Sequence, residues 1–187
     1  FVTPDNGTLA LVAEKFGIDE VRQIDEAVNR RQDSEKSYTF HGRDVYAYTG
    51  ARLASGAITF EQVGKKLPSK VEMISYQKAK YEKNTLVGNI PILDVQYGNI
   101  WTNIDRNTAS KMNIKKGDIF TVEIYNKDKL IFKDKMPFAN SFGDVPEGKN
   151  LMYYNSLDSL SFAVNMGDFA STYKIEYGGD WSVKIYK

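Results

Sequence analysis

The sequence predicts an α/β N-terminal part followed by an all-β, barrel-like C-terminal domain. Up to about residue 63, apolar residues recur at helical spacing, whereas beyond residue 86 they fall in short runs rich in β-branched and aromatic residues. Between these patterns the chain is polar and rich in lysine, which is typical of a connector. We therefore predict an α/β part at 1–68, a linker at 69–85 and a β-barrel-like domain at 86–187.

Three helices are expected in the N-terminal part. Residues 9–16 show apolar residues at helical spacing, and Gly17 follows as a stop. A second helix is expected at 44–54, ending before Gly56. A short third one is expected at 59–63.

The C-terminal part contains short apolar runs separated by turn residues. Residues 126–128 (NKD) have the composition of a hairpin tip between two of these runs. Many short antiparallel strands over about a hundred residues favour a small barrel or a sandwich. The expected strands lie at 86–93, 119–125, 129–132, 151–154 and 182–186.

Composition limits the kinds of partner. The 25 basic side chains nearly balance the 24 acidic ones, whereas binding to nucleic acid or an anionic membrane usually requires a basic surface. We expect a small-molecule partner, with no nucleic acid and no membrane. No apolar run approaches the roughly 20 residues that span a bilayer. The absence of cysteine excludes disulfides and suits a cytoplasmic protein.

Motifs for cofactor chemistry are missing from the sequence. There is no glycine-rich phosphate loop, no cluster of metal-ligating residues and no Gly-x-Ser-x-Gly elbow. We therefore expect neither a metal site nor a bound cofactor.

The only histidine is a candidate catalytic residue. Histidine is the side chain that exchanges protons most readily near neutral pH. His41 stands just before the second expected helix, and Gly42 beside it lets a ligand approach the backbone. This position suits a residue that orients or activates water. The alternative is a structural histidine that only makes hydrogen bonds.

A second group of candidates follows the apolar strand at 86–93. Asp94 ends this strand before a Tyr-Gly-Asn turn, which points a carboxylate out of the sheet end. Asn99 carries a donor and an acceptor on one planar group, and rings such as Tyr97 and Trp101 can stack on a purine or face a cation. The alternatives are turn-forming roles for Asp94 and Asn99 and core packing for the aromatic residues.

Three segments resemble one enzyme family. Residues 39–44 (TFHGRD), 94–104 (DVQYGNIWTNI) and 1–9 (FVTPDNGTL) are similar to blocks of the S-adenosylmethionine hydroxide adenosyltransferase family, which is related to the fluorinase and chlorinase enzymes. The resemblance runs nearly from end to end. It implies hydrolysis of S-adenosyl-L-methionine to adenosine and L-methionine, by attack of water or hydroxide at the ribose C5′.

The resemblance also implies roles for individual residues. His41 helps to hold the attacking water, Asp94 meets the methionine amino group, and Asn99 reads the adenine edge. Ser156 matches a serine that binds the methionine end, although residues 157–159 (LDS) depart from the Ser-Gly-Tyr or Arg-Gly-Tyr of several relatives. The implied catalytic residue is His41, and the implied substrate-binding residues are Asp94, Tyr97, Asn99, Trp101, Phe142, Ser156, Val164 and Met166.

Other functions remain open. Halogenase relatives carry Tyr-Ser where this chain has His41 and Gly42, which favours water over halide as the nucleophile. The alternatives are a halide-using 5′-halogenase, a protein that binds S-adenosylmethionine or adenosine without turnover, and a structural protein assembled through its β domain.

The resemblance further implies a segment upstream of the PDNG block, with an acidic residue and an arginine of the reaction centre. We expect the chain to be the remainder of a truncated α/β sandwich with its C-terminal domain, and to be inactive alone. The family also implies a homotrimer with sites at subunit interfaces.

Overall fold

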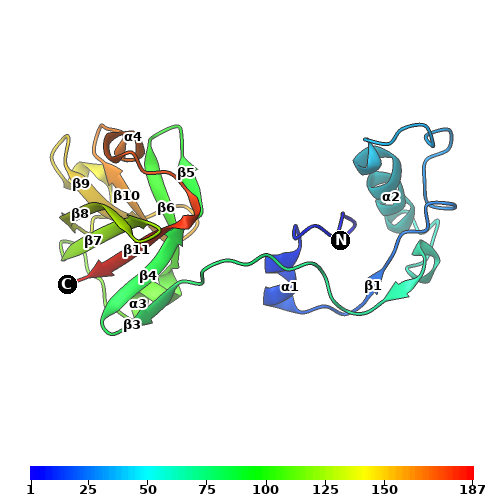
Figure 1. Ribbon diagram of the computed structural model, residues 1–187, viewed down its shortest axis with the longest axis horizontal. Helices are drawn as coiled ribbons and strands as arrows, with labels where there is room; N and C mark the ends of the chain where they lie inside the picture. Colours follow the sequence, from blue (N-terminus) through cyan, green and yellow to red (C-terminus); the bar gives the residue numbers. More distant parts are fainter. The chain divides into compact units, whose positions relative to one another are not determined.

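Three β-sheets and a few short helices make up the structure, a computed structural model that describes residues 1–187 (Figure 1). The chain divides into two units, Phe1–Ser75 and Tyr76–Lys187, each with its own internal contacts. This mixture of sheet and helix agrees with the general α/β class that the sequence predicts. Among the helices, none has both the length and the apolar character needed to cross a bilayer.

The first unit combines short helices with one two-stranded antiparallel sheet, β1 with β2. The predicted helix at 9–16 is confirmed as α1, which ends where Gly17 adopts a φ of 77°. The second predicted helix begins two residues earlier than expected, as a π-helix that continues into α2. The elements are α1 (Ala10–Phe16), β1 (Val21–Arg22), the π-helix η1 (Gly42–Ala47), α2 (Tyr48–Ala54), the 3-10 helix η2 (Glu61–Val63) and β2 (Lys66–Leu67).

Hydrogen bonds hold the interior of this unit together. Asn29 is buried, and its side-chain amide donates to Val63 O at 3.0 Å and accepts from Arg52 Nη1 at 2.9 Å. Its backbone oxygen accepts from Thr49 Oγ1 at 3.1 Å. Asn29 therefore ties the loop that follows β1 to both α2 and η2.

The second unit contains two antiparallel sheets. A five-stranded sheet has the order β3-β4-β11-β7-β8, and a four-stranded sheet has the order β5-β6-β10-β9. The first sheet comprises β3 (Lys80–Glu82), β4 (Thr85–Ile90), β7 (Ile119–Asn126), β8 (Lys129–Pro137) and β11 (Gly178–Tyr186). The second comprises β5 (Ile92–Asp94), β6 (Asn99–Asp105), β9 (Asn150–Tyr154) and β10 (Ser159–Val164), and the unit also contains α3 (Arg106–Ser110), η3 (Phe142–Asp144) and α4 (Phe169–Tyr173).

The predicted strands are all present, but they do not form one closed barrel. The two sheets meet at a corner where Gly88 of β4 approaches β6 so closely that a Cβ atom would lie 2.6 Å from Ile104 Cγ1. The Asn103 side chain bridges this corner, accepting from Asn89 N at 2.8 Å and donating to Gln77 O at 2.7 Å. At this corner, side-chain hydrogen bonds of Asn103 replace the backbone hydrogen bonds that would join two paired strands. Residues 80–82, which the sequence placed in a linker, form β3.

One apolar core fills the space between the two sheets. Inward-facing residues alternate along the strands, as in Phe120, Val122 and Ile124 of β7. Both sheets and the two helices α3 and α4 contribute to the same cluster. The fully buried large residues of the core are Leu86, Ile90, Ile100, Ile104, Phe120, Ile124, Met136, Met152, Leu160, Phe162 and Phe169.

A charged network lies on the opposite face of the five-stranded sheet. Glu123 accepts hydrogen bonds from Tyr125 Oη at 2.7 Å and Tyr186 Oη at 2.8 Å, and it pairs with Lys133 Nζ at 2.8 Å. The hydrogen bond from Lys133, followed by that from Tyr125, lowers the pKa of Glu123 from 4.5 to about 2.

Replacing Glu123 with glutamine should lower the free energy of unfolding by about 1–2 kcal/mol at neutral pH, because Lys133 loses a charged partner. A depressed pKa stabilises the fold above the unfolded-state value and loses this effect as pH falls through the folded-state value. The difference between Glu123→Gln and the parent should therefore shrink between about pH 4.5 and about pH 2. Urea unfolding at several pH values measures it.

The matched control is Glu82→Gln, because Glu82 pairs with Lys80 at 2.8 Å while both side chains are half exposed. Its effect should be small at every pH. A Glu123→Gln penalty that stays constant down to about pH 2 would contradict the assignment.

Candidate functional site

A hollow of about 670 Å³ opens on the second unit. Its wall begins at the end of β5, continues through the turn before β6, and is completed by η3, β9 and the segment between β10 and α4. The lining residues are Asp94, Gln96, Tyr97, Asn99, Phe142, Tyr153, Val164, Asn165, Met166, Gly167 and Asp168.

The turn between β5 and β6 is held tightly against the start of α4. Gly98 has a φ of 68°, and its carbonyl oxygen accepts from Ala170 N at 2.9 Å. A Cβ atom at position 98 would lie 2.1 Å from Asp168 Cγ. Asp168 in turn caps α4 by accepting from Ser171 N at 2.7 Å. Only glycine satisfies both the backbone angle and the space at position 98.

Aromatic packing fixes α4 in the core. Phe169 and Tyr173 of α4 both pack edge-to-face on Phe132, with ring centroids 5.1 and 4.5 Å away. The Tyr173 hydroxyl also exchanges hydrogen bonds with the Asn150 amide. Packing and hydrogen bonds within the protein therefore hold the wall that α4 supports.

Two buried polar atoms beside the hollow have no hydrogen-bond partner in the protein. Asn99 is 2% exposed, and its Nδ2 donates to Asp94 Oδ2 at 3.3 Å while Oδ1 has no partner. Trp101 Nε1, on the same side of β6, makes no hydrogen bond of good geometry, although it lies near enough to the Tyr153 hydroxyl to lower its pKa. An unsatisfied buried polar group costs about 1–3 kcal/mol, which a ligand with a matching donor or acceptor can recover.

Aromatic side chains cover one part of the hollow. The rings of Phe142 and Tyr153 lie 5.1 Å apart, and Tyr97 is exposed at the rim. Burial raises the pKa of the Tyr153 hydroxyl, against an opposite effect of the nearby Trp101 and Asn99 side chains. The raised pKa keeps the phenol protonated at neutral pH.

The lining of the hollow carries negative charge. Asp94 and Asp168 contribute carboxylates, and none of the eleven lining residues is basic. A positively charged ligand is favoured by both the carboxylates and the faces of the aromatic rings. The hollow is thus suited to a small cationic molecule that also carries a flat polar group.

Six of the predicted substrate-binding residues meet at this hollow, namely Asp94, Tyr97, Asn99, Phe142, Val164 and Met166. Trp101 lies one alternation along β6 from Asn99 and is not among the lining residues. Ser156 is exposed at the hairpin tip between β9 and β10, also outside the lining.

Sequence reasoning did not single out Tyr153 or Asp168. Asp168 could have been recognised from the sequence, because aspartate is a preferred N-cap residue and Asp168 directly precedes the helix α4. Tyr153 carried no such signal, since nothing in the strand sequence NLMYY distinguishes it from the adjacent Tyr154.

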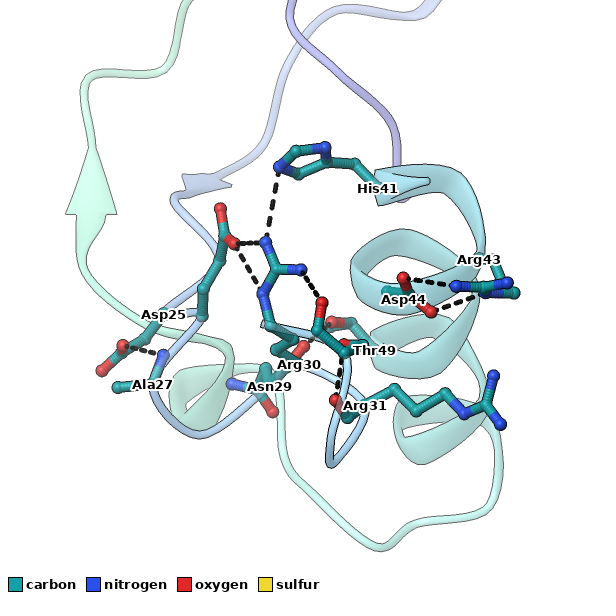
Figure 2. Close-up of polar contacts among 11 residues, drawn as sticks. Asp25, Ala27, Asn29, Arg30, Arg31, His41, Arg43, Asp44 and Thr49 are labelled. Atoms are coloured by element: carbon teal, nitrogen blue, oxygen red, sulfur yellow. Dashed lines mark hydrogen bonds and ion pairs between the residues drawn. The ribbon is translucent and has the colours of Figure 1, made fainter. Parts of the chain in front are cut away.

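The predicted catalytic histidine belongs to the first unit. His41 is half-buried at the start of η1, and its Nε2 lies 3.4 Å from Arg30 Nη2 (Figure 2). Three residues further on, Asp44 is fully buried and receives two hydrogen bonds from Arg43, at 2.7 and 2.9 Å. The Arg43 guanidinium holds the pKa of the Asp44 carboxyl below its usual value. Figure 2 shows this pair as a contact separate from that between His41 and Arg30.

The fold and the hollow define a class of protein with a hollow of small-molecule size on a β-rich second unit. Comparison with known families gives the class a name. The model of the SAM hydroxide adenosyltransferase N-terminal domain matches residues 1–64, and that of the C-terminal domain matches residues 88–182. The chain belongs to the SAM hydroxide adenosyltransferase family, which confirms the resemblance seen in the sequence.

Curated relatives carry two different activities in their names. The chain is 26% identical to a fluorinase of Nocardia brasiliensis over 99% of its own length and 60% of that protein. It is 30% identical to an (R)-S-adenosyl-L-methionine hydrolase of Methanocaldococcus jannaschii over 94% of its own length and 58% of that protein. The chain thus spans less than two thirds of the length of these relatives.

Solved structures share the fold. A conserved protein of Thermotoga maritima superposes with a TM-score of 0.83 at 32% identity, covering 98% of this chain and 66% of that one. A protein of Thermus thermophilus matches with a TM-score of 0.64 at 24% identity, covering 97% of this chain and 62% of that one.

Replacing Gly98 with alanine should damage both stability and ligand binding. The left-handed backbone and the contact with Asp168 together should cost about 2–4 kcal/mol of unfolding free energy, because the turn or α4 must move. Thermal unfolding and ligand titration measure the two effects.

Gly117→Ala is the matched control. Gly117 also has a positive φ, of 87°, but a Cβ atom there meets nothing within 4 Å. It should lose only about 1 kcal/mol and keep its ligand affinity. Equal effects of the two substitutions would show that the contact with Asp168 does not matter.

Proposed function

We propose that the protein hydrolyses S-adenosyl-L-methionine to adenosine and L-methionine, with water or hydroxide attacking the ribose C5′. The observation that carries the proposal is the hollow with two carboxylates, aromatic rings and no basic side chain, in a chain of the SAM hydroxide adenosyltransferase family. S-Adenosylmethionine is a cation with a flat polar base, which is the kind of molecule this lining favours. The homotrimer that the family resemblance implies is part of the same proposal.

The substrate contacts follow from the chemistry of the lining. Asp94 pairs with the ammonium group of the methionine moiety, and the buried Oδ1 of Asn99 accepts from an adenine N–H. Phe142 and Tyr97 face the purine or the sulfonium. The backbone around Val164 and Met166 borders the base. We assign Trp101 and Ser156 supporting roles, because neither lines the hollow.

The reaction needs help chiefly at the nucleophile. Attack at C5′ forms a carbon–oxygen bond and breaks the carbon–sulfur bond, whose electron pair stays on sulfur as a neutral thioether. The leaving group therefore requires no proton. The attacking water loses one proton, which passes to the solvent, whereas a hydroxide nucleophile has no proton to lose. A water molecule held in line behind C5′ has already lost most of the freedom that makes the uncatalysed reaction slow. We assign His41 to the orientation of this water.

His41-Gly42 in place of the Tyr-Ser of halogenase relatives supports water as the nucleophile. Because fluorinases and hydrolases match this chain at similar identities, the experiment must separate the two reactions.

Incubation of the full-length protein with S-adenosylmethionine in oxygen-18-labelled water should yield methionine and adenosine labelled in its 5′-hydroxyl. Addition of chloride or fluoride should produce no 5′-halogenated nucleoside. A His41→Ala variant should bind the substrate and lose about 100-fold or more in rate. Mass spectrometry of the products measures all three.

Each of the other outcomes would support a different function. A halogenated product would identify a halogenase, and ligand binding without any adenosine would identify a binding protein without turnover. Failure to bind either adenosine or S-adenosylmethionine would leave only the structural role.

An Asp94→Asn substitution should weaken binding of S-adenosylmethionine about tenfold, because it removes a charge and keeps the shape. Adenosine, which is neutral and lacks the ammonium group, serves as the matched ligand and should bind almost as before. Calorimetric titration of both ligands measures the difference. Equal losses for the two ligands would remove Asp94 from recognition of the cation.

A further inference from the structure

In the contact between His41 and Arg30, only Arg30 can be the hydrogen-bond donor. Nε2 of His41 lies 3.4 Å from Nη2 of Arg30, and Figure 2 shows the other ring nitrogen pointing away from Arg30. A guanidinium carries only N–H donors and cannot accept a hydrogen bond. The contact is therefore a hydrogen bond only when Nε2 carries a lone pair. In a neutral imidazole this places the proton on Nδ1.

Arg30 is not free to turn away from the ring. Its side chain is 14% exposed, and Nε donates to Glu26 Oε2 at 3.1 Å. Nη2 makes a second, shorter bond to the same carboxylate oxygen, and Nη1 donates to Ser34 O at 3.4 Å. Nη2 has two hydrogens, so it can serve Glu26 and His41 together.

The loop that carries Arg30 is itself anchored. The neighbouring Asn29 is bonded to α2 and η2, and Arg31 N donates to Asp44 O at 2.8 Å. The guanidinium therefore faces the imidazole from a fixed backbone. A ring with a proton on Nε2 would set two N–H groups against each other across this contact.

We infer that Arg30 is a positioning residue that holds His41 as the Nδ1-protonated tautomer, so that the ring meets its ligand as a hydrogen-bond donor. The consequence for catalysis rests on the proposed function. One lone pair of the water accepts from Nδ1–H and the other remains available for C5′. Nε2 is committed to Arg30, so His41 orients the water without serving as its base through that nitrogen.

The tautomer can be observed directly. In long-range nitrogen–proton NMR spectra of the full-length protein, the protonated and unprotonated ring nitrogens resonate far apart, and the His41 signals are identified by their loss in His41→Gln. In alkaline buffer, where imidazoles are neutral, we expect Nδ1 to give the protonated-type signal and Nε2 the unprotonated one. The reverse pattern in the parent protein overturns the inference.

Two variants test the role of Arg30. Arg30→Met should move His41 towards the Nε2-protonated form that predominates in free neutral histidine, and Arg31→Met, which alters the adjacent arginine, should leave the parent pattern unchanged. An Nδ1-protonated ring in Arg30→Met overturns the assignment to Arg30. If Arg30→Met does not fold, the parent spectrum still decides the tautomer.

Kinetics separate this inference from the proposed function. Arg30→Met should lower kcat for S-adenosylmethionine by up to about 100-fold with little change in KM, because Arg30 acts on the orientation of His41 rather than on the substrate. The expected tautomer without any hydrolysis by the parent would reject the proposed function alone. Hydrolysis with the reverse tautomer would reject only the inference.

Discussion

The close approach of the Gly98 backbone to the Asp168 carboxylate is the constraint on which the hollow depends. It brings the turn after β5 against the start of α4, and the hydrogen bond from Ala170 N to Gly98 O locks the two segments together. Asn99 follows immediately, and its burial is a result of this junction. The aromatic residues beneath α4 pack this helix, and with it the wall of the site, against the core.

The two units are stabilised by different means. The second unit has a continuous apolar core between its sheets, which fixes the positions of the lining residues by packing. The first unit buries few large apolar side chains and relies on the hydrogen bonds of Asn29 and Thr49. Directional bonds of this kind set the orientation of a loop closely. The arginine that faces His41 benefits from that orientation.

Elements with an uninterrupted apolar pattern could be predicted from the sequence, and those with polar interruptions could not. The helix before Gly17 and the strand β7 are of the first kind. β6 and β10 were missed because residues such as Thr102 and Ser161 break the pattern, yet Thr102 is buried with its hydroxyl bonded to Leu160 O. The corner at Asn103, where the two sheets meet without closing a barrel, is a long-range contact that has no local sequence signal. The sequence motifs contain several of the residues that line the hollow. Tyr153 lies outside these motifs and reaches the lining only because the fold brings β9 to the same hollow.

The absence of basic side chains from the lining has a consequence for selectivity under the proposed function. Demethylated S-adenosylhomocysteine has the same adenosine and amino-acid ends but an uncharged sulfur. In that proposal the ring faces stabilise the charge on the sulfonium, and the uncharged analogue gains nothing from that part of the lining. Under the proposed function, the demethylated by-product should therefore bind more weakly than the substrate. On this proposal the charge on sulfur, rather than the shape of the methyl group, would distinguish the substrate from its demethylated form.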